Sequence, residues 1–283
     1  GAWTVDAPDV WQMLAGGSGD DTYIVGSDIG RGIIDHGGEI LNDGMDTVRF
    51  EDLSIADLNI DRADHQNANG VALRFWWTAG PDRAAGEFHI ANGAEHIERF
   101  VFADGTTLSD IQFDTSGNLT LIGTDGDDRI AGGEGADTMI GGLGDDTYHV
   151  DNDGDVIVEL DETGIDTVHT SVHFSLRGHS QFIENLVMTG SANINANGND
   201  RDNVMTGNDG DNSFNGSAGN DYLIGGAGND IFLDDSGDDT FVGGAGSDTF
   251  IFASAGEADR ILDFETGVDR IEIGLGISSF SQI

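Results

Sequence analysis

The chain has 283 residues, of which 53 are Asp or Glu and 11 are Arg, with no Lys, and its formal net charge is −42. This charge argues against nucleic acid or an anionic membrane as a partner, because both attract basic side chains. The missing lysine excludes a Walker A phosphate loop and Schiff-base chemistry, and the missing cysteine excludes disulfides and thiolate metal sites. No apolar run approaches the length of about 18 residues that predicts a membrane-spanning helix, so we expect no membrane insertion.

Residues 1–45 hold one copy of a nine-residue pattern, Gly-Gly-x-Gly-x-Asp-x-apolar-x. In this copy Asp21 takes position 6 and Tyr23 takes position 8. Glycine adopts backbone angles that other residues avoid, so positions 1 to 6 predict a tight turn. The apolar residue at position 8 predicts a short strand with one inward side chain.

Residues 46–116 lack the pattern but contain strand-like runs at 71–77, 87–91 and 96–102, which predict a small β-rich insert. Trp76 and Trp77 lie in the first of these runs. They could pack in a core or form a stacking platform for a sugar. Adjacent strand residues point to opposite faces, so only one of them could meet a ligand, and the pattern favours core packing.

Residues 117–197 contain the first tandem block of the pattern, followed by a connector with wider spacing. Strand-like runs at 156–160 and 182–188 predict that the connector continues the same stack through wider turns. The candidate metal ligands at position 6 are Asp128, Asp137, Asp146 and, when the register is continued by nine residues, Asp155. The glycines at positions 2 and 4 that we expect to contribute to the same sites are Gly133, Gly135, Gly142 and Gly144.

Residues 198–251 form the second block, six consecutive nonapeptides without an insertion. Position 6 is occupied by Asn203, Asn212, Asp221, Asp230, Asp239 and Asp248. The corresponding loop glycines are Gly226, Gly228, Gly244 and Gly246. We expect residues 252–283 to cap the last apolar layer at the C-terminal end, because a solenoid needs such a cap.

One such unit cannot bury its apolar residue alone, but stacked units can. The repeats resemble those of the RTX (repeats-in-toxin) family, the haemolysin-type calcium-binding proteins secreted by bacteria. Residues 97–106 resemble a signature of a domain associated with that family, and residues 252–273 resemble the closing segment of serralysin-like proteins. The resemblance implies an all-β fold, a parallel β-roll (a calcium-binding β-helix solenoid) in two or more blocks with a β-rich insert. It also implies that two nonapeptides make one turn of 18 residues.

In such a roll, equivalent loops of successive turns lie about one strand spacing (~4.8 Å) apart. Two carboxylates at that distance repel by ~3 kcal/mol at an effective dielectric constant of ~20, so the fold favours a cation between them. Oxygen donors suit Ca²⁺, and we expect several ions, four or more. The expected strong pairs are Asp128–Asp146, Asp137–Asp155, Asp221–Asp239 and Asp230–Asp248, and the weaker pairs are Asn203–Asp221 and Asn212–Asp230. The alternative is that these aspartates only form Asx turns.

No catalytic constellation stands out. The zinc-protease pattern His-Glu-x-x-His is absent, and Ser180 lacks the closing glycine of a nucleophile elbow. His169 and His173 could share one strand face, but a transition-metal site needs more ligands than two. We therefore expect no enzyme within the chain and place any catalytic domain outside it. The many carboxylates leave open the alternative that a pair of them acts on polysaccharide.

The resemblance implies an extracellular or cell-surface protein exported by a type I route and folded by calcium. We expect a non-catalytic scaffold in a surface or matrix assembly, such as an S-layer, adhesin or filament. The alternative is an ancillary module of a secreted enzyme that acts on polysaccharide or protein, or of an epimerase. Self-association or an extracellular polysaccharide is the expected partner besides calcium.

Overall fold

The computed structural model describes residues 2–4, 12–14, 21–26, 31–34, 47–54, 58–64, 71–78, 85–90, 99–103, 105–113, 118–133, 135–159, 164–178, 181–253 and 257–274. The chain divides into two compact units, Gly1–Gly141 and Gly142–Ile283. Across the described residues the structure is nearly all parallel β, with short strands and one 3-10 turn. The expected parallel β-roll is therefore confirmed. The finer division into five segments stays a prediction.

The first unit begins with two five-stranded sheets. The first sheet contains, in spatial order, β1 (Ala2–Thr4), β3 (Thr22–Val25), β5 (Thr47–Phe50), β9 (Arg99–Val101) and β10 (Thr107–Leu108). The second contains β2 (Gln12–Leu14), β4 (Arg31–Ile34), β8 (Gly86–Ile90), β7 (Val71–Trp77) and β6 (Asn59–Asp64). The antiparallel strands β6, β7 and β8 distinguish the insert from the parallel coil around it.

The remaining strands of this unit lead from the end of the insert into the first tandem block. They are β11 (Asp110–Phe113), β12 (Leu119–Ile122), β13 (Arg129–Ala131) and β14 (Thr138–Ile140). β12 pairs in parallel with β14, so that Leu121 lies opposite Met139. Both side chains are fully buried, as the stacking of position 8 requires.

Aromatic side chains fill the core of the insert. The ring of Phe50 stacks on that of Phe102 at 5.0 Å and lies 5.1 Å from that of Phe75. Trp77 is buried with them, whereas Trp76 is half-buried and lies 5.9 Å from the guanidinium of Arg74. The two tryptophans thus point to different sides, as strand alternation dictates.

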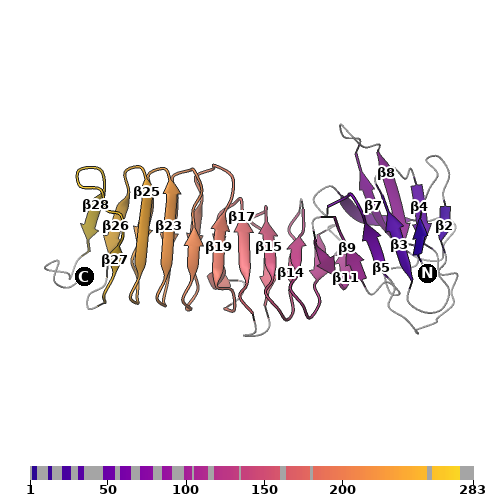
Figure 1. Cartoon of the computed structure of the whole chain (residues 1–283), viewed down its shortest axis with the longest axis horizontal. Coiled ribbons are helices and arrows are strands. Elements are labelled where there is room, and N and C mark those ends of the chain that lie inside the picture. Colours follow the sequence, from indigo (N-terminus) through magenta and orange to yellow (C-terminus); the bar gives the residue numbers. More distant parts are fainter. Residues whose placement is uncertain are drawn as a thin grey trace. The chain divides into compact units, whose positions relative to one another are not determined.

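The second unit is a coil whose strands alternate between two sheets (Figure 1). One sheet contains, in order, β15 (Thr147–Val150), β17 (Thr167–Thr170), β19 (Asn185–Met188), β21 (Val204–Thr206), β23 (Tyr222–Ala227), β25 (Thr240–Ala245) and β27 (Arg260–Ile261). The other contains β18 (Phe174–Ser175), β20 (Asn195–Asn197), β22 (Ser213–Asn215), β24 (Ile231–Leu233), β26 (Thr249–Phe252) and β28 (Arg270–Ile273). The unit also contains β16 (Val156–Val158) and the 3-10 turn η2 (Leu176–Gly178).

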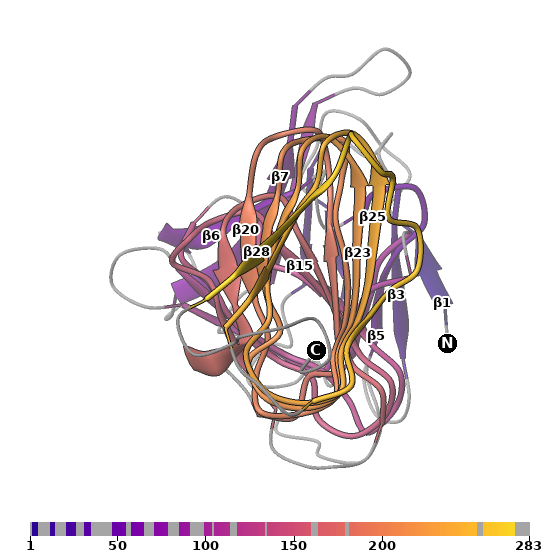
Figure 2. The same ribbon diagram turned by 90° about the vertical axis from the view of Figure 1, so that its left-hand side faces the viewer.

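Successive turns of this coil pair in parallel, and their equivalent residues stack in columns. Viewed along the coil, β23 and β25 lie in one layer and β20 and β28 in the other (Figure 2). The register places Phe214, Phe232 and Phe250 opposite one another along the second sheet. Their rings stack at 5.1 and 5.0 Å with interplanar angles of 5° and 8°. The apolar position 8 is thus the core of the coil.

The connector between the blocks keeps this register. β15, β17, β19 and β21 pair in succession although their spacing in sequence departs from a strict 18 residues. The extra residues lie in the loops, where they do not disturb the columns. No helix in the described part of the chain is long and apolar enough to cross a membrane.

Candidate metal centre

The position-6 aspartates of successive turns are hydrogen-bonded to one another in rows along the edges of the second unit. We call these rows ladders. One carboxylate oxygen of Asp239 accepts a hydrogen bond from the main-chain N–H of Asp221 at 2.8 Å. Asp248 accepts in the same way from Asp230 at 2.9 Å. Each loop is therefore hydrogen-bonded to the equivalent loop one turn earlier. The expected pairs Asp221–Asp239 and Asp230–Asp248 lie side by side, although their binding of metal stays a prediction.

The second carboxylate oxygen has a different environment. In Asp221, Asp230 and Asp248 it is buried and has no hydrogen-bond partner among the described residues. It lies against the position-1 glycine of its own loop: a Cβ on Gly216 would come within 2.0 Å of Asp221 Oδ2, and one on Gly225 within 2.3 Å of Asp230 Oδ2. A buried carboxylate oxygen without a donor is unfavourable unless a cation or a proton compensates it.

Backbone carbonyl oxygens line the space between successive loops. The carbonyl of Gly226 would lie 2.1 Å from a Cβ on Gly244, and that of Gly228 only 1.6 Å from a Cβ on Gly246. Likewise, the carbonyl oxygen of Gly243 would lie 2.4 Å from a Cβ on Gly225. Oxygens of two loops thus converge on one space, and only glycine at these positions leaves it open.

These glycines also need their backbone freedom. Gly244 has φ +92° and Gly246 has φ +144°, in a region that residues with a Cβ rarely adopt. The same holds for the other predicted loop glycines, which all have positive φ: Gly133, Gly135, Gly142, Gly144, Gly226 and Gly228.

Burial changes the acidity of the ladder. It raises the pKa of Asp221 and of Asp230 to about 7, with smaller contributions from the charges of Asp239 and Asp248 respectively. Burial likewise raises the pKa of Asp239 to about 6. The ionised carboxylate is thus disfavoured in the metal-free fold, which is the situation that a divalent cation relieves.

The donor set fits a hard cation. It consists of carboxylate and carbonyl oxygens, without sulfur or ring nitrogen, as Ca²⁺ prefers. Between the aspartate loops of the second block, the position-6 carboxylates and the carbonyls of positions 1, 2 and 4 would hold the ion. The ion would supply the positive charge that the buried carboxylates need.

The first block shows the same local arrangement within each unit. In the first unit, Leu119 donates its main-chain N–H to Asp137 at 2.8 Å, and Thr124 Oγ1 donates to Asp128 at 2.9 Å. In the second, Asp146 and Asp155 are almost fully buried. The pairs Asp128–Asp146 and Asp137–Asp155 each combine residues of both units and stay predictions. Asp21 is also buried, at the start of β3.

The position-6 asparagines belong to the same ladders. The main-chain N–H of Asn203 donates to Asp221 at 2.8 Å, and that of Asn212 donates to Asp230 at 2.7 Å. The predicted partial pairs are therefore adjacent in space. The contacts of their amide side chains differ from those of the aspartate side chains.

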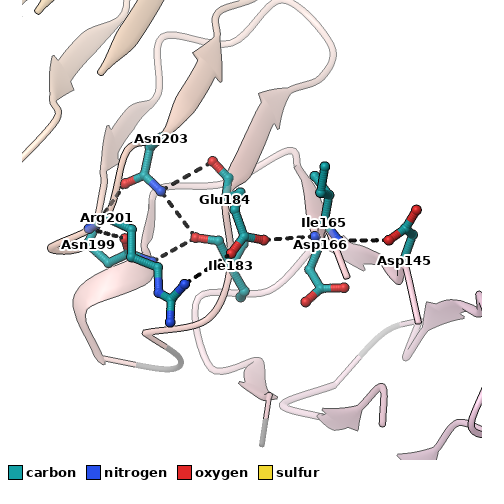
Figure 3. Close-up of polar contacts among 8 residues, drawn as sticks. All are labelled: Asp145, Ile165, Asp166, Ile183, Glu184, Asn199, Arg201 and Asn203. Carbon is teal, nitrogen blue, oxygen red and sulfur yellow. Dashed lines mark hydrogen bonds and ion pairs between the residues drawn. The ribbon is translucent and has the colours of Figure 1, made fainter. Parts of the chain in front are cut away.

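Four further acidic residues extend the ladders beyond the nonapeptides. Asp166 accepts the N–H of Asp146 at 2.8 Å, and Glu184 accepts that of Asp166 at 3.0 Å (Figure 3). Near the C-terminal end, Asp259 accepts from Asp239 at 3.0 Å and Asp269 from Asp248 at 3.1 Å. The nine-residue period does not predict these four residues, because their spacing breaks it. The shorter signal acidic-x-apolar, as in Asp166-Thr167-Val168, identifies all four.

Two acidic clusters in the described part of the second unit could hold a metal ion, with one ligand atom from each residue within 4.8 Å of the others. Asp146, Glu159 and Asp166 form the first, in which Tyr148 donates its hydroxyl proton to Glu159. Asp234, Glu257 and Asp259 form the second. The first cluster combines two ladder residues with Glu159, and the second combines one ladder residue, Asp259, with Asp234 and Glu257.

The comparison with known families decides the identity of the repeats. A model of the RTX calcium-binding nonapeptide repeat matches residues 115–157, 197–232 and 224–254, as four copies. The chain therefore contains RTX calcium-binding nonapeptide repeats. Its RTX repeats bind calcium, as expected, and repeats of this kind are typical of exported proteins. No curated protein matches the chain.

The two histidines weighed as a transition-metal pair, His169 and His173, have different neighbours in the structure. The ring of His169 stacks on that of His149 at 5.1 Å on neighbouring strands, and His173 accepts the N–H of Asn195 at 2.9 Å. Ser180 lies outside the described residues.

Proposed function

We propose that the chain is a non-catalytic module that calcium folds after export and that serves as a scaffold in a surface or matrix assembly. The observation that carries the folding part is the ladder of buried carboxylates. Asp221 and Asp230 each bury an oxygen without a hydrogen-bond donor among the described residues, and burial raises the pKa of both groups. Calcium that binds only the folded coil adds its binding free energy to folding.

Export by a type I route fits this mechanism. At the low calcium concentration inside a cell, repulsion within a chain of net charge −42 would oppose the coil. At millimolar extracellular calcium, the ions would neutralise the loops and the coil would form. The chain would then leave the cell unfolded and fold outside it.

Exposed apolar side chains support the scaffold role. On the last turn, Leu262, Val268 and Phe264 are 58%, 46% and 39% exposed, and on the outer strand faces Val204 and Ile231 are 43% and 42% exposed. Exposed apolar side chains that lie together favour contact with another surface. We infer that this surface mediates self-association of the folded coil.

Circular dichroism with a calcium titration tests the folding part. We expect a cooperative gain of β structure as calcium rises into the millimolar range, and its loss in EGTA. A chain that is equally folded in excess EGTA would contradict the proposal. Magnesium at the same concentration is the control, because it prefers small octahedral sites and keeps its water ligands.

Light scattering with and without calcium tests the scaffold part. Calcium-dependent oligomers are the expected result. A strict monomer at saturating calcium would exclude self-association and favour an ancillary module of a secreted enzyme.

A further inference from the structure

Asparagine occupies positions 2 and 6 in the first two loops of the second block. The four residues are Asn199, Asn203, Asn208 and Asn212, and all are buried. The full repeat copies that follow have glycine at position 2 and aspartate at position 6, as in Gly226 and Asp230. The third and fifth loops have Ser217 and Asp235 at position 2 but keep aspartate at position 6, so within the second block asparagine at both positions is specific to the two loops that join the connector to the block.

In the first loop, the asparagine amides are directed back to the preceding turn. Asn203 Nδ2 donates to the carbonyls of Ile183 and Glu184 at 3.1 and 3.2 Å, and Asn199 Nδ2 donates to that of Ile183 at 2.7 Å (Figure 3). Asn203 Oδ1 accepts the main-chain N–H of Asn199 at 2.9 Å, which holds the loop closed. Every carbonyl in this group has an N–H donor.

The second loop repeats the arrangement on the other edge. Asn208 Nδ2 donates to the carbonyls of Thr189 and Ala192 at 3.0 and 3.1 Å, and Asn212 Nδ2 donates to that of Ile194 at 3.2 Å. Asn212 Oδ1 accepts the main-chain N–H of Asn208 at 2.9 Å. Two independent loops thus share one hydrogen-bond pattern.

We propose that these asparagine pairs take the place of a calcium ion, so that the two turns joining the connector to the block form without metal. In the glycine–aspartate loops, carbonyl and carboxylate oxygens converge and leave a cation to neutralise them. Here the amide groups donate to the carbonyls and carry no charge. The carbonyl of Ile183 accepts from both Asn199 and Asn203, so both of its lone pairs are occupied and neither is left for a cation.

A neighbouring ion pair reinforces the metal-free turn. The guanidinium of Arg201 lies 3.8 Å from the carboxylate of Glu184 and 5.0 Å from the centre of the Phe182 ring. The chain thus supplies a positive charge beside the carboxylate of Glu184.

The consequence is an order of folding. A solenoid forms by adding turns to an existing neighbour, so its first turn is the difficult one. If the turns around β20, β21 and β22 form without calcium, they provide the surface on which the calcium-dependent turns stack. This inference rests on the proposed calcium-driven folding, and it adds the place in the coil at which folding starts.

The test converts one asparagine pair into the glycine–aspartate pair. We expect the double variant Asn199→Gly, Asn203→Asp in the full chain to bind one more calcium ion, measured by calcium analysis after equilibrium dialysis. In EGTA, hydrogen exchange should be slower for the amides of β20 to β22 than for those of β24 to β26 in the unaltered chain. In the variant Asn199→Gly, Asn203→Asp, the amides of both groups of strands should exchange at similar rates in EGTA. Asn229→Asp is the matched control, because it makes the same charge change at an exposed loop position.

A reverse variant keeps the test decisive if the first does not fold. Ser217→Asn, Asp221→Asn introduces the asparagine pair into the third loop, and we expect it to bind one ion fewer. If both variants bound the same number of calcium ions as the unaltered chain, the inference would be overturned. Calcium-driven folding would still stand. A wild-type chain that binds no calcium would instead contradict the proposed function.

Discussion

At the scale of single residues, glycine decides whether an interloop space exists. Gly246 has φ +144°, and a Cβ there would lie 1.6 Å from the carbonyl oxygen of Gly228. A side chain would both strain the backbone and fill the space in which oxygens of the two loops converge. The glycine pattern is therefore part of the metal site as well as of the turn.

We expect Gly246→Ala to lower stability in calcium by more than the ~1–2 kcal/mol of left-handed backbone strain, because the added methyl also meets the carbonyl. A calcium titration followed by circular dichroism would show the effect as a higher calcium concentration at the midpoint of folding. Gly267→Ala is the matched control, since Gly267 has φ +86° but nothing within 4 Å of its Cβ position. Equal effects of the two substitutions would show that the interloop space is unimportant.

The charge of a position-6 aspartate should act in opposite directions with and without calcium. Burial raises the pKa of Asp230 to about 7, so its ionised form destabilises the metal-free coil above neutral pH. We expect Asp230→Asn at pH 8 to increase residual structure in EGTA and to raise the calcium midpoint several-fold. Circular dichroism measures both.

Asp211→Asn provides the control for this change. Asp211 is exposed and accepts the N–H of Asn229 at 2.7 Å, so the substitution removes a charge outside the interloop space. A similar shift for Asp211→Asn and Asp230→Asn would indicate a general effect of net charge.

At the scale of the element, the three-residue strands β22 and β24 each contribute one large side chain to the core, Phe214 and Phe232. Phe232 stacks between Phe214 and Phe250, and its ring also meets that of Phe241 edge-on at 5.8 Å. Stacked and edge-on aromatic pairs contribute ~0.5–1.5 kcal/mol each beyond the area they bury. The short strands of three residues are thus held mainly by their central side chain.

We expect Phe232→Ala to destabilise the calcium-bound protein by ~3–5 kcal/mol, as for other buried aromatic residues. Urea unfolding at saturating calcium would measure it. The neighbouring Ile231 points outward and is 42% exposed, so Ile231→Ala should change stability by less than ~0.5 kcal/mol. A small effect of Phe232→Ala would mean that the loops, and not the core column, hold the turn.

At the scale of the whole molecule, the ladder couples folding to pH and calcium together. The pKa values of Asp221, Asp230 and Asp239 are raised from 3.8 to about 7, 7 and 6. The folded coil therefore binds protons more tightly than the unfolded chain. Stability of the calcium-free coil is fully present below pH ~4 and is lost as the pH rises through 6 to 7.

We expect the calcium-free chain to be more ordered at pH 4.5 than at pH 8, and calcium to restore order at pH 8. Circular dichroism in EGTA across this range is the measurement. Light scattering on the same samples separates folding from precipitation, because the sequence isoelectric point is near 4.1. Greater order at pH 8 than at pH 4.5 without calcium would contradict the role of the buried carboxylates.

The sequence determined the repeating part of this protein. A fixed period of glycine, aspartate and apolar residue predicts the turn, the inward side chain and the acidic ladder, since each depends on local backbone requirements that recur. The tight packing of Phe214, Phe232 and Phe250 follows from that period alone.

Only the tertiary structure decided what happens where the period breaks. Glu184 joins the acidic ladder of Asp166, and Asn203 satisfies the carbonyls of Ile183 and Glu184, although no fixed spacing predicts these contacts. Such contacts depend on how many residues the loops of the connector take up between strands. That number can vary without disturbing the core columns, so the partners across a wide turn are set by stacking in three dimensions and not by position in the sequence.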